Sequence, residues 1–312
     1  MVRLLKIFNQ IYEQLFSRKT KQQKGVGLYI GAESFSLCVI DNIAEIEETT
    51  RCYSARFPAT IKSYATDFFT DKSSAKYIFD FIKQFVPQKT EDINLILPDN
   101  IANIAVTPVH FATDIQARGY TQFQSSEIFN RHLTEPIFSV CRIERYVSKS
   151  PKEQKSKYLV ACAEMANMIM LKECANANNI DLITAEPVAL CALRAFTNIS
   201  QGNVLFVFAS LTLLFFVTLH NGRTENFYAP AFDAEKEGFI EKFSETIISV
   251  AENFHPEHDT LKIKLAGDDI KYKICETLEK LNVAKEVSLA KCKLDLTSLE
   301  DVLSFGAALR NS

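Results

Sequence analysis

The stretch GVGLYIGAESFSLCVID, residues 25–41, is the most informative part of this chain. Gly31 divides it into two short apolar arms, whose large side chains are Val26, Leu28, Ile30, Phe35, Leu37 and Val39. Apolar runs of this length with a glycine between them predict two β-strands joined by a tight turn. On this segment alone, an ordinary β-hairpin of any α/β domain and a hairpin that binds phosphate are equally good interpretations.

The composition is that of a globular chain. Its 312 residues are 47% apolar and 23% charged, enough for two domains or one large two-lobed unit. The formal net charge of −3 argues against an overall nucleic-acid footprint. Eight cysteines occur without a Cys-x-x-Cys pair, which argues against zinc ribbons and predicts buried, reduced thiols in a cytosolic protein.

The densest apolar segment is VLFVFASLTLLFFVTL, residues 204–219. It is shorter than the roughly 20 residues that a membrane-spanning helix needs. It is rich in Phe, Val and Thr, and it carries Ser210 and Thr212 near a break. The segment therefore predicts two buried strands joined by a turn.

The first 24 residues differ from the rest. Residues 1–16 place large apolar side chains on one face of a helix, among them Leu4, Leu5, Phe8, Ile11 and Phe16. Six basic residues, including Arg18 and Lys19, against one acidic residue give residues 1–24 a net charge of +5. Neither the apolar core nor the cleavage site of a signal peptide is present. Two interpretations stay open: a helix docked on its own domain, or a helix on anionic lipid or a membrane partner.

Strand and helix patterns divide the remaining chain into two lobes, each with three strands followed by helices. We expect a first lobe over residues 25–200 and a reduced second lobe over residues 201–312. Within the first lobe, residues 99–157 predict an inserted subdomain of short strands with a helix over residues 125–133. Longer helices are expected over residues 73–85, 165–178, 186–196, 235–254, 268–281 and 298–310.

This repeated plan resembles the two-lobed actin/hexokinase-like (ribonuclease H-like) fold. Four segments are similar to the actin-like pilus-assembly proteins of bacteria, the PilM family and its shorter relative MshI of mannose-sensitive pilus biogenesis. GLYIGAESFSLCVID resembles the first phosphate hairpin, and NVLFVFASLTLLFFVTLHNGR resembles the second. AEPVALCALRAF resembles the connecting helix, and AGDDIKYKICETLEKLNV with LSFGAALRN resembles the nucleotide-base motif and the closing helix.

This chain departs from the family pattern at the positions that would bind magnesium and phosphate. The resemblance implies a magnesium-orienting Asp where Tyr29 stands, a second Asp at Phe206 and a glycine at Phe208. A glycine there would let the backbone approach the phosphate, and we expect the Phe208 ring to fill that space. A phenol stays protonated at neutral pH, and Mg²⁺ prefers carboxylate oxygens. Remnants of the nucleotide motifs are Gly31, Ser34, Ser210, Thr212 and Gly267. We therefore expect no cofactor, no ATP hydrolysis, and weak or absent binding of ATP and magnesium.

The resemblance also implies a partner. In FtsA-like relatives such as PilM, the inserted subdomain and the first lobe form a groove for the cytoplasmic tail of a PilN-type inner-membrane protein. Such a groove works by apolar pockets and backbone pairing. Candidates for its wall are Val106, Val109, Phe111, Phe123 and Arg131.

Three functions follow from these features. The first is a non-catalytic scaffold on the cytoplasmic side of the inner membrane, in pilus assembly or alternatively in type II secretion. The second is an ATP-binding actin-like ATPase with unusual phosphate ligands, and the third is an FtsA-like filament.

The sequence His255-Pro256-Glu257-His258-Asp259 offers imidazoles and carboxylates, but Pro256 indicates a polar loop at a helix end, so no metal site is expected. The oligomeric state is left open.

Overall fold

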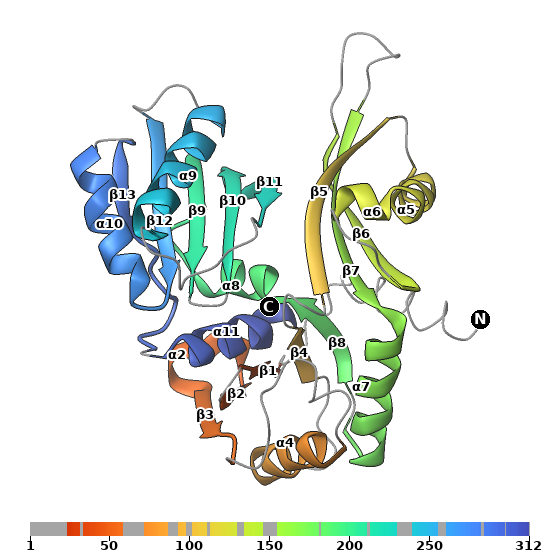
Figure 1. The fold of residues 1–312 in the computed structure, drawn as a ribbon. Coiled ribbons are helices and arrows are strands. Elements are labelled where there is room, and N and C mark those ends of the chain that lie inside the picture. The colour runs from red at the N-terminus through yellow and green to blue at the C-terminus, as the bar shows by residue number, and fades with distance from the viewer. Residues whose placement is uncertain are drawn as a thin grey trace.

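Three sheets and their covering helices build the protein (Figure 1). The structure is a computed structural model, and it describes residues 24–31, 34–58, 72–86, 93–97, 102–110, 113–129, 134–145, 155–180, 182–210, 213–229, 239–254, 260–281, 284–296 and 298–311. Two five-stranded sheets form the two lobes, and a three-stranded sheet stands beside the second lobe.

The first sheet has the strand order β3-β2-β1-β4-β8, with an antiparallel hairpin and two parallel strands. Its strands are β1 (Gly25–Ile30), β2 (Ser34–Ile40), β3 (Thr50–Arg56), β4 (Ile93–Leu97) and β8 (Leu182–Pro187). The short η1 (Ile43–Glu45) and α2 (Ile46–Thr49) join β2 to β3. One face packs on α4 (Lys72–Phe85) and α7 (Met165–Ala177) through the alternate residues Val26, Leu28, Ile30, Phe35, Leu37 and Val39. The predicted hairpin is therefore confirmed, and its apolar arms are explained by this core.

The second sheet repeats the plan in the order β11-β10-β9-β12-β13. Its strands are β9 (Asn203–Ala209), β10 (Leu214–His220), β11 (Arg223–Tyr228), β12 (Leu261–Gly267) and β13 (Glu286–Leu289). The helices α9 (Phe239–Phe254) and α10 (Ile270–Leu281) cover the outer face. Residues 204–209 are buried throughout because both faces of β9 are covered, which is why the sequence there is continuously apolar.

The third sheet, with the order β5-β7-β6, is inserted between β4 and β8. Its elements are β5 (Ala102–His110), α5 (Asp114–Phe123), α6 (Ser125–Ile128), β6 (Pro136–Arg145) and β7 (Lys155–Glu164). The sheet extends past the expected boundary at residue 157, because β7 runs directly into α7. The expected helix over residues 125–133 is a single turn in its described part. The main helix lies earlier, where Thr113 and Gln116 form a capping box.

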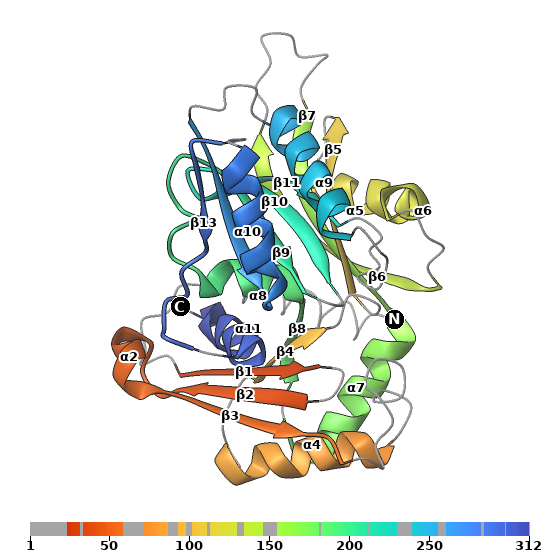
Figure 2. The same cartoon turned by 60° about the vertical axis from the view of Figure 1, so that its left-hand side comes forward.

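Two helices fill the space between the lobes. They are α8 (Val188–Ala195) and α11 (Leu299–Ala308), which ends in η4 (Leu309–Asn311). Figure 2 shows α11 lying across β1, beneath the second lobe. Sequence reasoning assigned residues 201–312 to the second lobe, but α11 packs against β1, β2, β4 and α8. The chain thus returns to the first lobe at its end.

Glycines set the distance of α11 from its neighbours. A Cβ atom on Gly27 would lie 2.0 Å from the Ser304 carbonyl oxygen, and one on Gly25 would lie 2.1 Å from that of Ala308. On the other side of the helix, a Cβ on Gly306 would lie 2.0 Å from the carbonyl oxygen of Cys191 in α8. Backbone therefore meets backbone on both sides of α11, and only glycine leaves room for it.

We expect Gly27→Ala to lower the free energy of unfolding by about 1–3 kcal/mol or more, because the added methyl must push α11 off the sheet. Gly119→Ala is the matched control, since a Cβ there meets nothing within 4 Å. The control should raise the stability of helix α5 by about 0.5–1 kcal/mol. Urea denaturation of both variants measures the change in the free energy of unfolding. Equal changes would contradict the proposed close packing of α11 on β1.

Candidate functional site

A cleft of about 1060 Å³ lies between the lobes, where the two hairpins face each other. Tyr29, Gly31 and Ser34 line it from the first hairpin, and Ser210 and Gly267 line it from the second lobe. The fold therefore brings together every remnant of the nucleotide motifs that the structure describes. Thr212, the fifth remnant, lies outside the described residues.

The remnants of the first hairpin have local partners. The Gly31 N–H donates to the Ser34 carbonyl at 2.8 Å and closes the turn. The Ser34 hydroxyl donates to Glu300 Oε1 at 3.2 Å, in the first turn of α11. Next to this contact, Ser36 Oγ donates to Asp301 Oδ1 at 2.6 Å. A carboxylate thus stands beside the hydroxyl that, by the resemblance, would meet a phosphate.

The remnants of the second lobe also have structural roles. The Ser210 hydroxyl accepts from the Leu213 N–H at 3.0 Å, which closes the turn between β9 and β10. Gly267 has φ +123°, and a Cβ there would lie 1.7 Å from the Ala209 carbonyl oxygen. The Asp268 N–H donates to this same oxygen at 3.0 Å. Glycine at position 267 is therefore required by the close approach of β12 to β9, whatever the cleft binds.

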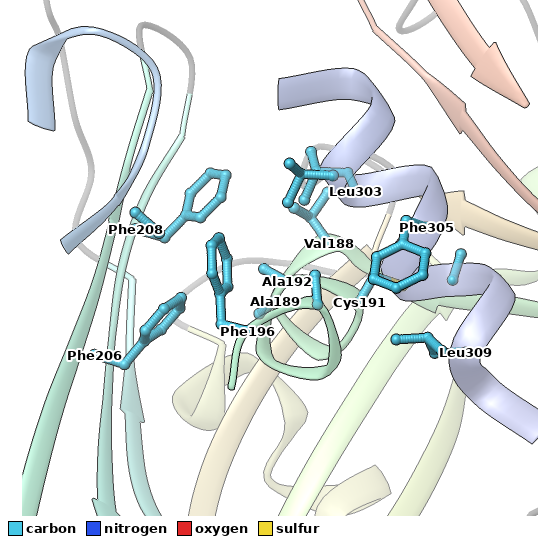
Figure 3. Packing of buried hydrophobic residues seen from close by; sticks show 14 of the residues in the cluster. Val188, Ala189, Cys191, Ala192, Phe196, Phe206, Phe208, Leu303, Phe305 and Leu309 are labelled. Atoms are coloured by element: carbon cyan, nitrogen blue, oxygen red, sulfur yellow. The ribbon is translucent and has the colours of Figure 1, made fainter. Parts of the chain in front are cut away.

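Phe206 and Phe208 point from β9 into the layer between the second sheet and helices α8 and α11 (Figure 3), and neither of them lines the cleft. Both are buried, and the Phe208 ring stacks on Phe215 with centroids 4.9 Å apart. Phe196 lies 5.5 Å from Phe206, also between centroids. The Phe208 ring therefore packs in this buried layer and does not line the cleft, where we expected it to fill the phosphate space.

Charges of both signs line the cleft. The acidic side chains are Glu47, Asp268, Asp269, Asp295 and Glu300, and the basic ones are Arg56, Lys271, Lys291 and Lys293. Lys271 Nζ donates to the Gly267 carbonyl at 2.8 Å. Across the described part of the chain, no three His, Cys, Asp or Glu side chains are grouped so that they could hold a metal ion. The sequence His255–Asp259 lies outside that part.

Glu186 lies near the end of β8, two residues before α8, and forms a buried ion-pair network. Its carboxylate contacts the Arg194 guanidinium, and Arg310 Nη1 lies 3.2 Å from its Oε1. Arg194 Nε also donates to the Gly306 carbonyl at 3.0 Å. The network joins β8, α8 and the end of α11, so it holds together the helices between the lobes.

Burial and the neighbouring charges together set the pKa values of the groups in this network. Burial alone would raise the pKa of Glu186, but the positive charges of Arg194 and Arg310 outweigh it and hold the pKa below the ordinary 4.5. Burial raises the pKa of the neighbouring Cys191 thiol to about 12, so this thiol stays protonated. Its Sγ–H donates to Glu186 Oε2 at 3.7 Å.

Glu186→Gln should lower the free energy of unfolding by about 3–5 kcal/mol, because it leaves two buried guanidiniums without their carboxylate. Since the folded-state pKa lies below 4.5, the stabilisation is complete above that pH and is lost as the pH falls through the folded-state pKa. The difference between wild type and variant should therefore stay constant from neutral pH to about pH 5 and shrink below it. Urea denaturation across this range measures it. Glu276→Gln, which removes a fully exposed partner of Lys280, is the control and should leave stability unchanged.

A second site lies where the inserted sheet meets the first lobe. We call the side of this sheet that faces the second lobe its inner face; it carries Ile104, Val106, Ile137, Ser139, Leu159 and Ala161. The end of the inner face nearest the first lobe, the strand ends of β4 and β8, and α7 together line a small groove of about 70 Å³. Its lining residues are Leu97, Ile137, Ser139, Ala161, Cys162, Ala163, Met168, Ala185 and Pro187. Sequence reasoning missed them because they come from five separate elements.

The predicted wall residues lie elsewhere. Val106 is on the inner face but does not line the groove, and Val109 is buried in the core beneath α5. Phe123 is 86% exposed on α5, on the other side of the sheet from the groove. Val109 and Phe123 therefore do not line this groove, because strand alternation and the presence of α5 decide where they point. Phe111 and Arg131 lie outside the described residues.

The residues expected to touch a membrane, Leu4, Leu5, Phe8, Ile11, Phe16, Arg18 and Lys19, also lie outside the described residues. Within the part of the chain that the structure covers, no helix combines the length and apolarity needed to cross a membrane. All eight cysteines are free, and four of them are buried.

No family model matches the chain, and no curated protein matches it by sequence. A chain of the "PilM-PilN type IV pilus biogenesis complex" matches its structure with a TM-score of 0.69 at 10% identity, covering 93% of this chain and 99% of that chain. A protein of unknown function with an actin-like ATPase fold from Bacteroides thetaiotaomicron gives a TM-score of 0.49 at 9% identity, with coverages of 86% and 91%. The cytoplasmic domain of EpsL, an inner membrane component of the type II secretion system of Vibrio cholerae, gives 0.45 at 10% identity, with coverages of 92% and 95%. The protein therefore has the two-lobed actin-like fold, in an arrangement similar over nearly its whole length to that of the PilM–PilN structure.

Proposed function

We propose that this protein is a non-catalytic scaffold of type IV pilus biogenesis, of the MSHA-like kind, at the cytoplasmic face of the inner membrane. In this role it binds the cytoplasmic tail of a PilN-type inner-membrane protein. The observation that carries the proposal is the groove between the inserted sheet and the first lobe, on a fold similar to that of the PilM–PilN complex.

The groove, with a volume of about 70 Å³, has properties that suit one small apolar side chain of an extended peptide. Small side chains at Ala161, Ala163 and Ala185 leave room above the sheet, and Met168 supplies a flexible apolar wall. Ser139, exposed on the inner face, offers a hydroxyl beside them. Among the described strands, β6 pairs only with β7, so its other edge is available to an extended segment. Apolar pockets next to a strand edge are a recurring mode of peptide recognition.

Met168→Glu should weaken binding of a synthetic PilN-type tail peptide by about 100-fold, because it places a charge in the apolar wall of the groove. The adjacent Ile169 is 40% exposed on the same helix and does not line the groove, so Ile169→Glu is the matched control. Fluorescence anisotropy of the labelled peptide with the full chain measures both. Equal loss in the two variants, or no loss in either, would contradict the proposed groove.

The second part of the proposal is that the cleft does not hydrolyse ATP. Phosphoryl transfer depends on charge neutralisation by magnesium, and Tyr29 offers a phenol where the resemblance implies a carboxylate. Glu300 lies beside Ser34, so a bound polyphosphate would face like charge at this point. Gly267 and Ser210, the other retained motif residues, are accounted for by strand packing and turn formation.

Isothermal titration of the full chain with ATP and magnesium should therefore show no binding at micromolar concentrations, and phosphate release should equal the buffer rate. An actin-like ATPase under the same conditions serves as the positive control. Magnesium-dependent binding with a micromolar Kd would contradict the pseudo-ATPase proposal but leave the peptide groove standing.

A further inference from the structure

Two cysteines face each other across neighbouring strands of the first sheet. Cys38 on β2 lies directly opposite Cys52 on β3 in the antiparallel register. Opposite residues of such a ladder point to the same face of the sheet, and both side chains pack into the layer that contains α8 and α11. Both thiols are free. The pair is therefore a dithiol built into the sheet, and neither the groove nor the scaffold function proposed above uses it.

The backbone geometry at this pair suits a disulfide. Just beyond the ladder, the Asp41 N–H donates to the Thr49 carbonyl at 3.2 Å, which marks a hydrogen-bonded pair. Hydrogen-bonded and non-hydrogen-bonded pairs alternate along an antiparallel ladder, so Cys38 and Cys52 form a non-hydrogen-bonded pair. The Cα atoms of such a pair lie about 4.5 Å apart, within the range of roughly 4.4–6.8 Å that disulfides span. A disulfide can therefore form without separating the strands.

The two sulfur atoms are neighbours with different access to solvent. Cys38 is fully buried, and a hydrogen bond with Cys52, together with burial, raises the pKa of the Cys38 thiol well above its ordinary value. Because the thiolate is the reactive form, Cys38 does not react by itself with a soluble oxidant at neutral pH. Cys52 is only partly buried. An oxidant therefore meets Cys52 first.

A pocket of about 430 Å³ gives access to Cys52. Glu47, Thr50 and Cys52 line it from the first lobe, and residues 293–296, which precede α11, line it from the other side. Glu47 and residues 293–296 also line the cleft between the lobes, so the pocket and the cleft adjoin. A molecule as small as hydrogen peroxide can therefore reach Cys52 from the cleft.

We propose that Cys38 and Cys52 form a reversible redox site, which a peroxide converts into a cross-strand disulfide. With hydrogen peroxide, Cys52 Sγ attacks one oxygen: an S–O bond forms, the O–O bond breaks, and the second oxygen leaves as water with the thiol proton. Cys38 Sγ then attacks the sulfur of this sulfenic acid. The S–S bond forms, the S–O bond breaks, and the hydroxyl leaves as a second water with the Cys38 proton. Two electrons pass from the two thiols to one peroxide.

The disulfide would act as a temporary link at the edge of the first sheet. It would join β2 to β3 beside the connection formed by η1 and α2, which carries Glu47 to the rim of the cleft. A cross-link restricts the unfolded chain, so oxidation should stabilise the first lobe. At the cytoplasmic location proposed above, the thiol pool keeps such pairs reduced, and thiol–disulfide exchange would reverse the link.

Peptide mapping of the full, pre-reduced chain tests the site. Hydrogen peroxide, followed by alkylation of the remaining thiols, should give peptides joined through Cys38 and Cys52 with the loss of two thiols, and dithiothreitol should restore both. Cys52→Ala should abolish the linked peptides, and Cys38→Ala should stop at a Cys52 sulfenic acid, which dimedone traps. Cys292→Ser is the matched control, since Cys292 is also partly buried and lines the adjoining cleft. This variant should give the linked peptides in the wild-type yield.

Urea denaturation tests the effect of the link. The oxidised wild type should unfold at a higher urea concentration than the reduced protein, whereas the same treatment should not shift the midpoint of Cys52→Ala. Linked peptides that join other cysteines, Cys52 oxidised to sulfinic acid without a disulfide, or thiols that survive a peroxide dose at which Cys292 is consumed would overturn the proposal. A disulfide that leaves the wild-type midpoint unchanged would overturn its stabilising effect. None of these outcomes bears on the peptide groove, which Met168→Glu tests separately.

Discussion

The backbone contact of helix α11 with strand β1 on one side and helix α8 on the other is the constraint on which the rest of this structure depends. Gly27 and Gly306 allow it, since a single methyl group at either position would overlap a carbonyl oxygen. Helix α11 follows the second lobe in the chain but packs on the sheet of the first lobe. Its other side packs toward the second sheet. The buried network of Glu186, Arg194 and Arg310 ties the end of α11 to the start of α8. The two lobes are thus joined through one layer of helices.

The same contact explains the state of the cleft. The first turn of α11 brings Glu300 and Asp301 to the serines of the first hairpin. The face of β9 that turns toward α8 and α11 carries phenylalanines, so the layer between the second sheet and these helices is apolar. An open cleft remains, but hydrogen bonds and strand packing account for the motif residues that line it. The two-lobed frame is thus present, and Gly31, Ser34, Ser210 and Gly267 each have a structural contact within it.

The inserted sheet gives the molecule two separate outward surfaces. Its inner face meets strand β11 and the first lobe and forms the groove, whereas α5 covers the outer face and exposes Ile115 and Phe123. Strand alternation separates the two surfaces, because successive residues of β5, β6 and β7 point to opposite sides.

The sequence by itself determined the two hairpins, the two-lobed plan and the presence of an insertion. These features rest on local patterns: apolar runs around Gly31, a continuous apolar strand at residues 204–209, and turns at Gly202 and Gly222. The phenol of Tyr29, where the resemblance implies a carboxylate, was equally visible, because it needs only a comparison of residue types. Tertiary structure decided what is non-local. It returned α11 to the first lobe, gave Gly267 and Ser210 their structural partners, and gathered the groove from five elements. It also placed Val109 in a core and Phe123 in solvent, since the direction of a side chain depends on strand register and on a helix that the apolar pattern did not reveal.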